Sequence, residues 1–122
     1  RRSSDRGTSR TMTQLLIVDA DLLERERMVK LLAAEGHHCH VMTRGQDALA
    51  RVRQGQIDAV LTELMLIDMS GLYLVEWLRA HHPNIPTVLI TGRGNEDIAA
   101  EALQEGACSY IPKRRMAQDL LR

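Results

Sequence analysis

Five short apolar runs, separated by segments of helical periodicity, constrain the fold of this chain more than any other feature. The runs have the length of β-strands, and they are LLIV (15–18), CHVM (39–42), AVLTE (59–63), TVLI (87–90) and SYIP (109–112). Continuous apolar strands that alternate with helices are typical of a parallel sheet covered on both faces. The pattern therefore predicts an α/β fold.

The segments between these runs repeat apolar residues at helical spacing. The four stripes are Met28, Val29 and Leu32; Ala48, Leu49 and Val52; Leu74, Val75 and Leu78; and Ile98, Ala99, Ala102 and Leu103. Gly36, Gly55 and Gly106 each follow such a segment, where a helix C-cap favours a residue that tolerates a positive φ. A fifth helix is predicted from about Arg115, with Met116, Leu120 and Leu121 on one stripe.

The chain divides into a tail, residues 1–12, and one domain, residues 13–122. The tail, RRSSDRGTSRTM, is polar and aperiodic, so we expect it to be flexible. The fifth helix stops at Arg122, short of the usual helix length, so we expect the natural protein to continue into an output domain.

Charge and composition exclude several classes of function. Sixteen basic residues balance sixteen acidic ones, which predicts no direct binding to nucleic acid by this domain. No apolar run approaches the roughly 20 residues of a membrane span. Cys39 and Cys108 are too few for a disulfide framework, which favours a reducing, cytoplasmic location.

Polar residues follow the predicted strands at their carboxyl ends, where open α/β sheets bind ligands. They are Asp19, Asp21, Glu63, Thr91 and Lys113. Acids clustered so closely repel one another unless a hard cation such as Mg²⁺ or a lysine offsets their charge. Asp21 has a second interpretation, because it also lies where an N-cap of the first helix is expected.

Residues 14–113 resemble the receiver domain of bacterial two-component response regulators. The similarity rests on LLIVDAD, DAVLTELMLIDMSGLYLVEWLR, IPTVLITGRG and EALQEGACSYIPKR. It implies a flavodoxin-like, doubly wound five-stranded parallel sheet of order 2-1-3-4-5, and a signal-transduction domain rather than an enzyme. In this family an aspartate accepts a phosphoryl group from a partner histidine kinase on Mg²⁺.

The resemblance assigns a role to each strand-end residue but also exposes two departures. Thr91 and Tyr110 match the switch residues, and Lys113 matches the invariant lysine. Glu63, however, stands where the family has its phosphoacceptor aspartate, and Ala20 replaces the second acid, usually a metal ligand.

These departures put the metal in doubt. The resemblance places the metal ligands at Asp19, Glu63 and Met65, and without an acid at position 20 we expect weak Mg²⁺ binding or none. Glu63 carries one more methylene than aspartate, enough to reach Lys113 and form an ion pair that needs no metal. We therefore expect an atypical, phosphorylation-independent receiver, either locked part-way to the active state or kept as a docking surface.

The implied partners are a histidine kinase or other signalling protein and a covalently linked output domain. A homodimer through the fourth helix, fifth strand and fifth helix is also implied. The residues placed at that interface are Ala100, Glu101, Gln104 and Arg115.

Two alternatives remain open at this stage. One is a conventional receiver, phosphorylated with Mg²⁺ held by Asp19, Glu63 and Asp21. The other is a flavodoxin-like module that binds a nucleotide or flavin beside TGRGNE (91–96), where a lone GxG is a weak signal.

A separate motif, GHHCH (36–40), contains three histidines and one cysteine. On a strand, His38 and His40 face one side and Cys39 the other, which makes a joint tetrahedral metal site awkward.

Overall fold

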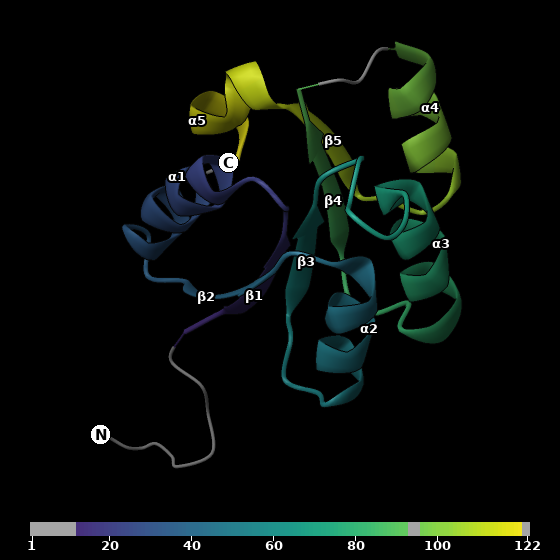
Figure 1. The fold of residues 1–122 in the computed structure, drawn as a ribbon, viewed down its shortest axis with the longest axis horizontal. Helices are drawn as coiled ribbons and strands as arrows, with labels where there is room; N and C mark the ends of the chain where they lie inside the picture. The colour runs from purple at the N-terminus through teal and green to yellow at the C-terminus, as the bar shows by residue number, and fades with distance from the viewer. Residues whose placement is uncertain (1–11, 93–95, 121–122) are drawn as a thin grey trace.

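The computed structural model describes residues 12–92 and 96–120, which form a five-stranded parallel sheet between two layers of helices (Figure 1). The strands are β1 (Gln14–Val18), β2 (His38–Met42), β3 (Ala59–Thr62), β4 (Thr87–Thr91) and β5 (Ser109–Pro112). The helices are α1 (Leu22–Ala33), α2 (Gly45–Arg53), α3 (Gly71–His81), α4 (Glu96–Gln104) and α5 (Met116–Asp119), the last after a 3₁₀ turn at Lys113–Arg115. The strand order β2-β1-β3-β4-β5 confirms the predicted doubly wound topology.

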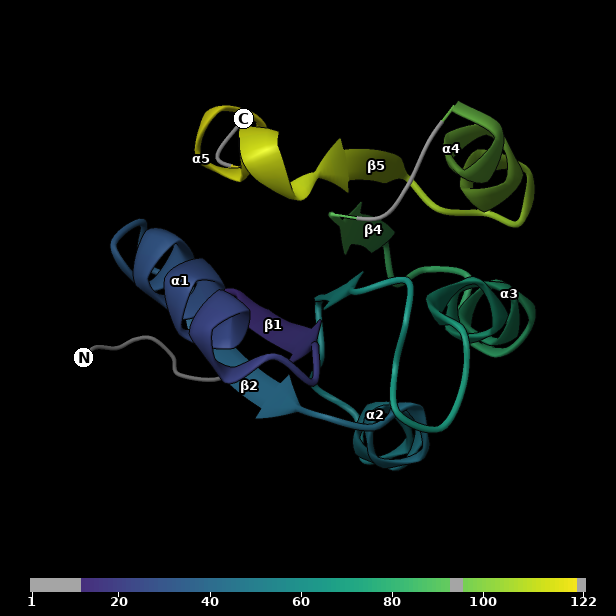
Figure 2. The same cartoon turned by 45° about the horizontal axis from the view of Figure 1, so that its top comes forward.

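The two faces of the sheet bury different helices (Figure 2). α1 and α5 cover one face, and α2, α3 and α4 cover the other. Successive residues of β1 point to opposite faces. Leu16 packs in the same cluster as Leu74 of α3, whereas Ile17 packs with Met28 of α1 and Met116 of α5. Because both faces are covered, the strand sequence is apolar throughout instead of alternating.

The predicted element boundaries differ from the observed ones in small ways. Glu63 lies just beyond the end of β3 instead of within the strand. Leu103, which was predicted to lie on the buried stripe of α4, is 52% exposed, while Ala102 of the same helix is fully buried. α4 therefore buries a narrower stripe than its sequence indicates.

The ends of the chain fall mostly outside the structure. Of the tail predicted at 1–12, only Met12 is described, and the stripe predicted for the fifth helix loses Leu121 to the undescribed residues. The glycine turn considered at 91–96 includes residues 93–95, which also lie outside the described part. Within the described residues, no helix is both long and apolar enough to cross a bilayer.

The loop between β3 and α3 packs closely against the end of β3. Gly71 begins α3 directly over this end, and a Cβ at this position would overlap the carbonyl oxygen of Glu63. The Gly71 N–H also donates to the Leu64 carbonyl oxygen at 2.6 Å. Only glycine allows this approach, so the first residue of α3 fixes the backbone that carries Glu63.

The same loop also caps a different helix. The backbone of Arg44 marks the start of α2, but its side chain makes no capping hydrogen bond. Asp68, 23 residues after Gly45, caps the helix instead. Its carboxylate accepts from the Gly45 N–H at 2.7 Å and from the Gln46 N–H at 3.0 Å. Asp68 therefore ties the loop that follows Glu63 to the N-terminus of α2.

We expect Asp68→Ala to lower the melting temperature at neutral pH, because two N–H groups of α2 lose their acceptor. The hydrogen bond from the Gln46 N–H outweighs the opposing effect of burial and, with the hydrogen bond from the Gly45 N–H, holds the pKa of Asp68 below its ordinary value of 3.8. The ionised carboxylate of Asp68 therefore stabilises the fold fully at pH values above 3.8, and this stabilisation is lost as the pH falls through the lowered pKa.

Thermal unfolding followed by circular dichroism over a series of pH values measures this effect. The difference between wild type and Asp68→Ala should be constant near neutrality and shrink in acid. Glu76→Ala, at an exposed position of α3, is the matched control. Equal melting temperatures for Asp68→Ala and wild type at neutral pH would contradict the capping role.

Candidate functional site

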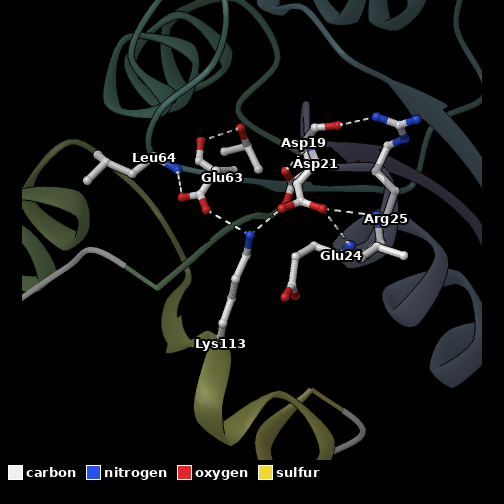
Figure 3. A network of polar contacts seen from close by, with 9 residues as sticks. Asp19, Asp21, Glu24, Arg25, Glu63, Leu64 and Lys113 are labelled. Atoms are coloured by element: carbon white, nitrogen blue, oxygen red, sulfur yellow. Dashed lines mark hydrogen bonds and ion pairs between the residues drawn. The ribbon is translucent and has the colours of Figure 1, made fainter.

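Three of the charged side chains predicted at strand ends meet at the carboxyl edge of the sheet (Figure 3). Asp19 follows β1, Glu63 follows β3, and Lys113 follows β5. Because the strands are parallel, their carboxyl ends lie at one edge, which brings residues 94 positions apart in sequence into contact.

The ammonium group of Lys113 lies between the two carboxylates. Its Nζ is 2.9 Å from Asp19 Oδ2 and 2.9 Å from Glu63 Oε1. Asp19 is 2% exposed and Glu63 is 9% exposed, so solvent screens these ion pairs little. The ion pair expected between Glu63 and Lys113 is present, and Asp19 joins it.

Burial opposes the positive charge of Lys113, but the contacts with Asp19 and Glu63 outweigh it. The net effect raises the pKa of Lys113 above its ordinary value of 10.5. Lys113 is therefore a permanent cation at neutral pH, and it offsets the repulsion between the two buried acids.

Backbone N–H groups hold the other oxygen of each carboxylate. Asp19 Oδ1 accepts from the Asp21 N–H at 2.9 Å, and Glu63 Oε2 accepts a short hydrogen bond from the N–H of Leu64. Each carboxylate thus has one oxygen on the backbone and one on the ammonium group. This arrangement fixes both side chains without any bound ion.

Asp21 acts as the N-cap of α1. Its Oδ1 accepts from the N–H groups of Leu23 and Glu24, at 3.0 Å and 3.2 Å. The carboxylate borders the same cavity as Asp19 but is turned toward the helix. Of the two interpretations that the sequence left open for Asp21, the structure displays the cap.

The two residues assigned to the switch lie beside this cluster. Thr91, at the end of β4, is 1% exposed. Tyr110 of β5 is half-buried and packs against the cluster that contains Leu89 and Ala102. Thr91, Tyr110 and Lys113 together border a small cavity of about 100 Å³.

Sequence reasoning missed two residues of α1. The guanidinium group of Arg25 donates to the backbone oxygen of Asp19 at 2.9 Å. Glu24 borders the main cavity, of about 470 Å³, with Asp19, Glu63 and Lys113. The spacing of Asp21 and Glu24 is that of a capping box, which is the signal that could have drawn attention to Glu24.

Glu24 does not complete that capping box. Its usual donor would be the Asp21 N–H, which instead donates to Asp19. Glu24 Oε2 is buried and receives no hydrogen bond from the described residues. Asp19 Oδ2 is also buried without a hydrogen bond from these residues, and its ion pair with Lys113 offsets its negative charge. The cavity therefore keeps an excess of negative charge near α1.

The side chains of the cavity do not fit Mg²⁺ as they stand. Mg²⁺ requires nearly octahedral oxygen ligands. Of the positions expected to bind it, Asp19 and Glu63 are both directed at Lys113, and Met65 brings no carboxylate. Among the described residues, no group of three or more histidine, cysteine, aspartate or glutamate side chains is placed to hold a metal ion.

Comparison with known proteins gives consistent matches. A family model described as the response regulator receiver domain matches residues 15–122. The chain is 30% identical over 97 residues to the DNA-binding transcriptional regulator NtrC of Proteus hauseri, covering 80% of this chain and 20% of that protein. It is 32% identical over 99 residues to the transcriptional regulatory protein ZraR of Salmonella typhimurium, covering 81% and 22%. The chain thus spans about a fifth of the length of these relatives.

Solved structures agree with the architecture. A CheY-like response regulator receiver domain protein from Methanospirillum hungatei has a TM-score of 0.84 at 26% identity, covering 91% of this chain and 89% of that one. The receiver domain of NtrX from Brucella abortus has a TM-score of 0.82 at 29% identity, covering 88% and 91%.

The ion pairs of Lys113 should make a measurable contribution to stability. Lys113→Ala leaves two buried carboxylates without their cation, and we expect the free energy of unfolding to fall by about 1–3 kcal/mol. Urea unfolding followed by the fluorescence of Trp77 measures the change.

Lys30→Ala, at an exposed position of α1, is the control for removing a lysine, and its effect should stay within about 0.5 kcal/mol. If Lys113→Ala costs no more than this control, the ion pairs contribute nothing to stability.

Proposed function

Because the chain belongs to the response regulator receiver domain family, we propose that it is a signalling domain that works without phosphorylation. The observation that carries the proposal is the ammonium group of Lys113, 2.9 Å from both Asp19 and Glu63. In this arrangement the residue at the phosphoacceptor position is held in an ion pair.

Glu63 is poorly placed to act as a phosphoacceptor. An acceptor needs a free carboxylate oxygen in line with the incoming phosphorus. Both oxygens of Glu63 are engaged, one by Lys113 and one by the Leu64 N–H. The extra methylene also displaces the carboxylate by about 1.5 Å relative to aspartate. Misplacement of about 1 Å costs on the order of 100-fold in rate.

This chain also lacks a complete set of ligands for the metal that the family uses. Ala20 provides no ligand, and the Lys113 ammonium already pairs with both buried acids and offsets part of their charge. We propose that the domain binds Mg²⁺ weakly or not at all, and that Lys113 takes over the neutralising role of the metal.

The output surface proposed for this domain is formed by α4, β5 and α5. Ala100, Glu101, Gln104 and Arg115 are all exposed there, as a surface that contacts a second copy or a partner requires. Glu63 carries one negative charge against nearly two for a phosphoryl group, so it presets the active arrangement only in part.

The proposed partners are a histidine kinase or another signalling protein and an output domain on the same chain. The relatives NtrC and ZraR are named as transcriptional regulators and are about five times longer than the matched segment, which supports a linked output domain. We place the domain in the cytoplasm and assign it no enzymatic activity.

Phosphorylation is tested directly with a small phosphodonor. After incubation with acetyl phosphate and Mg²⁺, intact mass spectrometry should show no phosphorylated wild-type protein. The double variant Ala20→Asp/Glu63→Asp should gain a phosphoryl group, because it restores the acceptor and the missing metal ligand. Stable phosphorylation of the wild type would instead establish a conventional Mg²⁺-dependent receiver.

Metal affinity is tested by calorimetric titration with Mg²⁺. The wild type should bind much more weakly than Ala20→Asp/Glu63→Asp, since it lacks the acid at position 20 that the double variant supplies as a ligand. Equal affinities would show that another carboxylate, such as that of Glu24, already supplies the missing ligand.

The preset state is tested with Glu63→Asp alone, without a phosphodonor. The shorter side chain should loosen the contact with Lys113 and lower the dimer fraction measured by light scattering. Lys30→Ala serves as the control for an unrelated surface change. An unchanged oligomeric state would show that the domain is a fixed docking module and that Glu63 does not preset its output.

A further inference from the structure

Two histidines outside the acidic cavity lie side by side on β2. His38 and His40 are two residues apart, so they point to the same face of the strand. Their ring centroids are 4.7 Å apart, with the rings edge-on to one another. β2 lies at the edge of the described sheet, where His38 is exposed and His40 is half-buried.

The spacing of the rings fits a shared metal ion. A zinc-to-nitrogen bond is about 2.0–2.1 Å, and the ring centroid lies about 1.1 Å further out, so each centroid would be about 3.2 Å from the metal. Two rings at angles of about 90–109° around the ion then have centroids about 4.5–5.2 Å apart. The observed 4.7 Å lies inside this range.

The side chain of His40 is already oriented by a neighbour. Its Nε2 lies 2.8 Å from Gln14 Oε1, and an amide oxygen only accepts, so in the neutral ring Nε2 carries the proton and Nδ1 keeps a lone pair. Gln14 is itself fixed in β1 by a hydrogen bond from its backbone N–H to Asp58 Oδ2, at 2.7 Å. Histidine ligands of metals typically donate their second ring N–H in this way.

Arg51 of α2 lies near enough to His40 for its charge to act on the ring. This charge repels a dication, so the affinity should be lower than that of a closed structural zinc site.

We propose that His38 and His40 form a two-imidazole site for a divalent transition metal such as Zn²⁺ or Ni²⁺. Imidazole suits these ions better than Mg²⁺ or Ca²⁺. Water completes the coordination, because the described residues supply no third histidine, cysteine or carboxylate placed to share the ion. Cys39 lies on the opposite face and packs against the cluster under α1.

The site is separate from the acidic cavity. His38 pairs with Gln14 at the start of β1, whereas Asp19 follows the end of the same strand. Five residues of extended chain span about 16 Å. Metal binding at β2 therefore does not depend on the proposed role of Glu63, and each proposal can fail without the other.

The test is a calorimetric titration of the wild-type chain with ZnCl₂ and with NiCl₂ in a buffer that does not chelate metals. We expect saturable binding of one ion per chain. His38→Ala and His40→Ala should each abolish it over the concentration range in which the wild type saturates. Gln14→Leu should weaken it about 10-fold, the usual effect of removing the partner of a metal-bound imidazole.

His81→Ala removes an exposed histidine from α3 and is the matched control that should bind as the wild type does. Circular dichroism verifies that each variant is folded, and ¹⁵N–¹H spectra of the imidazole groups locate the ion. Unchanged Zn²⁺ and Ni²⁺ binding in folded His38→Ala and His40→Ala would overturn the proposal, as would the absence of saturable binding in the wild type.

Discussion

The contact of one ammonium group with two buried carboxylates is the interaction on which the functional edge of this domain depends. Asp19 and Glu63 approach each other because β1 and β3 are neighbouring parallel strands. Two buried carboxylates so close together would raise the energy of the fold unless a cation lay between them. Lys113 comes from the far edge of the sheet, so this ion pair also links β5 to its centre. The contacts that balance the charge of the site are therefore the same contacts that hold the end of β5 against the ends of β1 and β3.

The sequence predicts the fold well because its strands are buried on both faces. Runs such as LLIV can lie only in the interior of such a sheet, and the glycines after α1, α2 and α4 adopt the positive φ expected at helix ends. It also predicts that Glu63 reaches Lys113, since residue type and strand position decide that contact. The role of Asp68 could not be predicted, because it caps a helix that begins 23 residues earlier. Its position near that helix depends on the path of the whole loop between β3 and α3. Glu24 was missed for a similar reason: its expected donor, the Asp21 N–H, is taken by Asp19, a competition visible only in three dimensions.

The surroundings of Glu63 restrict its movement. Gly71 packs against its carbonyl oxygen, and Asp68 anchors the following loop to α2. Thr62 Oγ1 donates to the same carbonyl oxygen at 3.0 Å. A backbone held on this many sides leaves the side chain as the only adjustable part. The extra methylene of glutamate therefore changes the position of the carboxylate, because the strand cannot shift to compensate for it.

A permanent glutamate and a transient phosphoryl group act differently on a two-state domain. A ligand or modification shifts such an equilibrium only by its differential interaction with the two states, and only while it is present. Under the proposed function, the interaction of Glu63 with Lys113 biases the domain toward one state, and this bias is constant because the interaction is part of the chain. A constant bias carries no information about a signal. Under the proposed function, regulation must then come from something that varies, such as the concentration of a partner or the occupancy of a second site. The histidine pair on β2 lies outside the acidic cluster that contacts Lys113. Under the two proposals, the occupancy of an ion at this pair is free to vary while Glu63 keeps the acidic edge fixed.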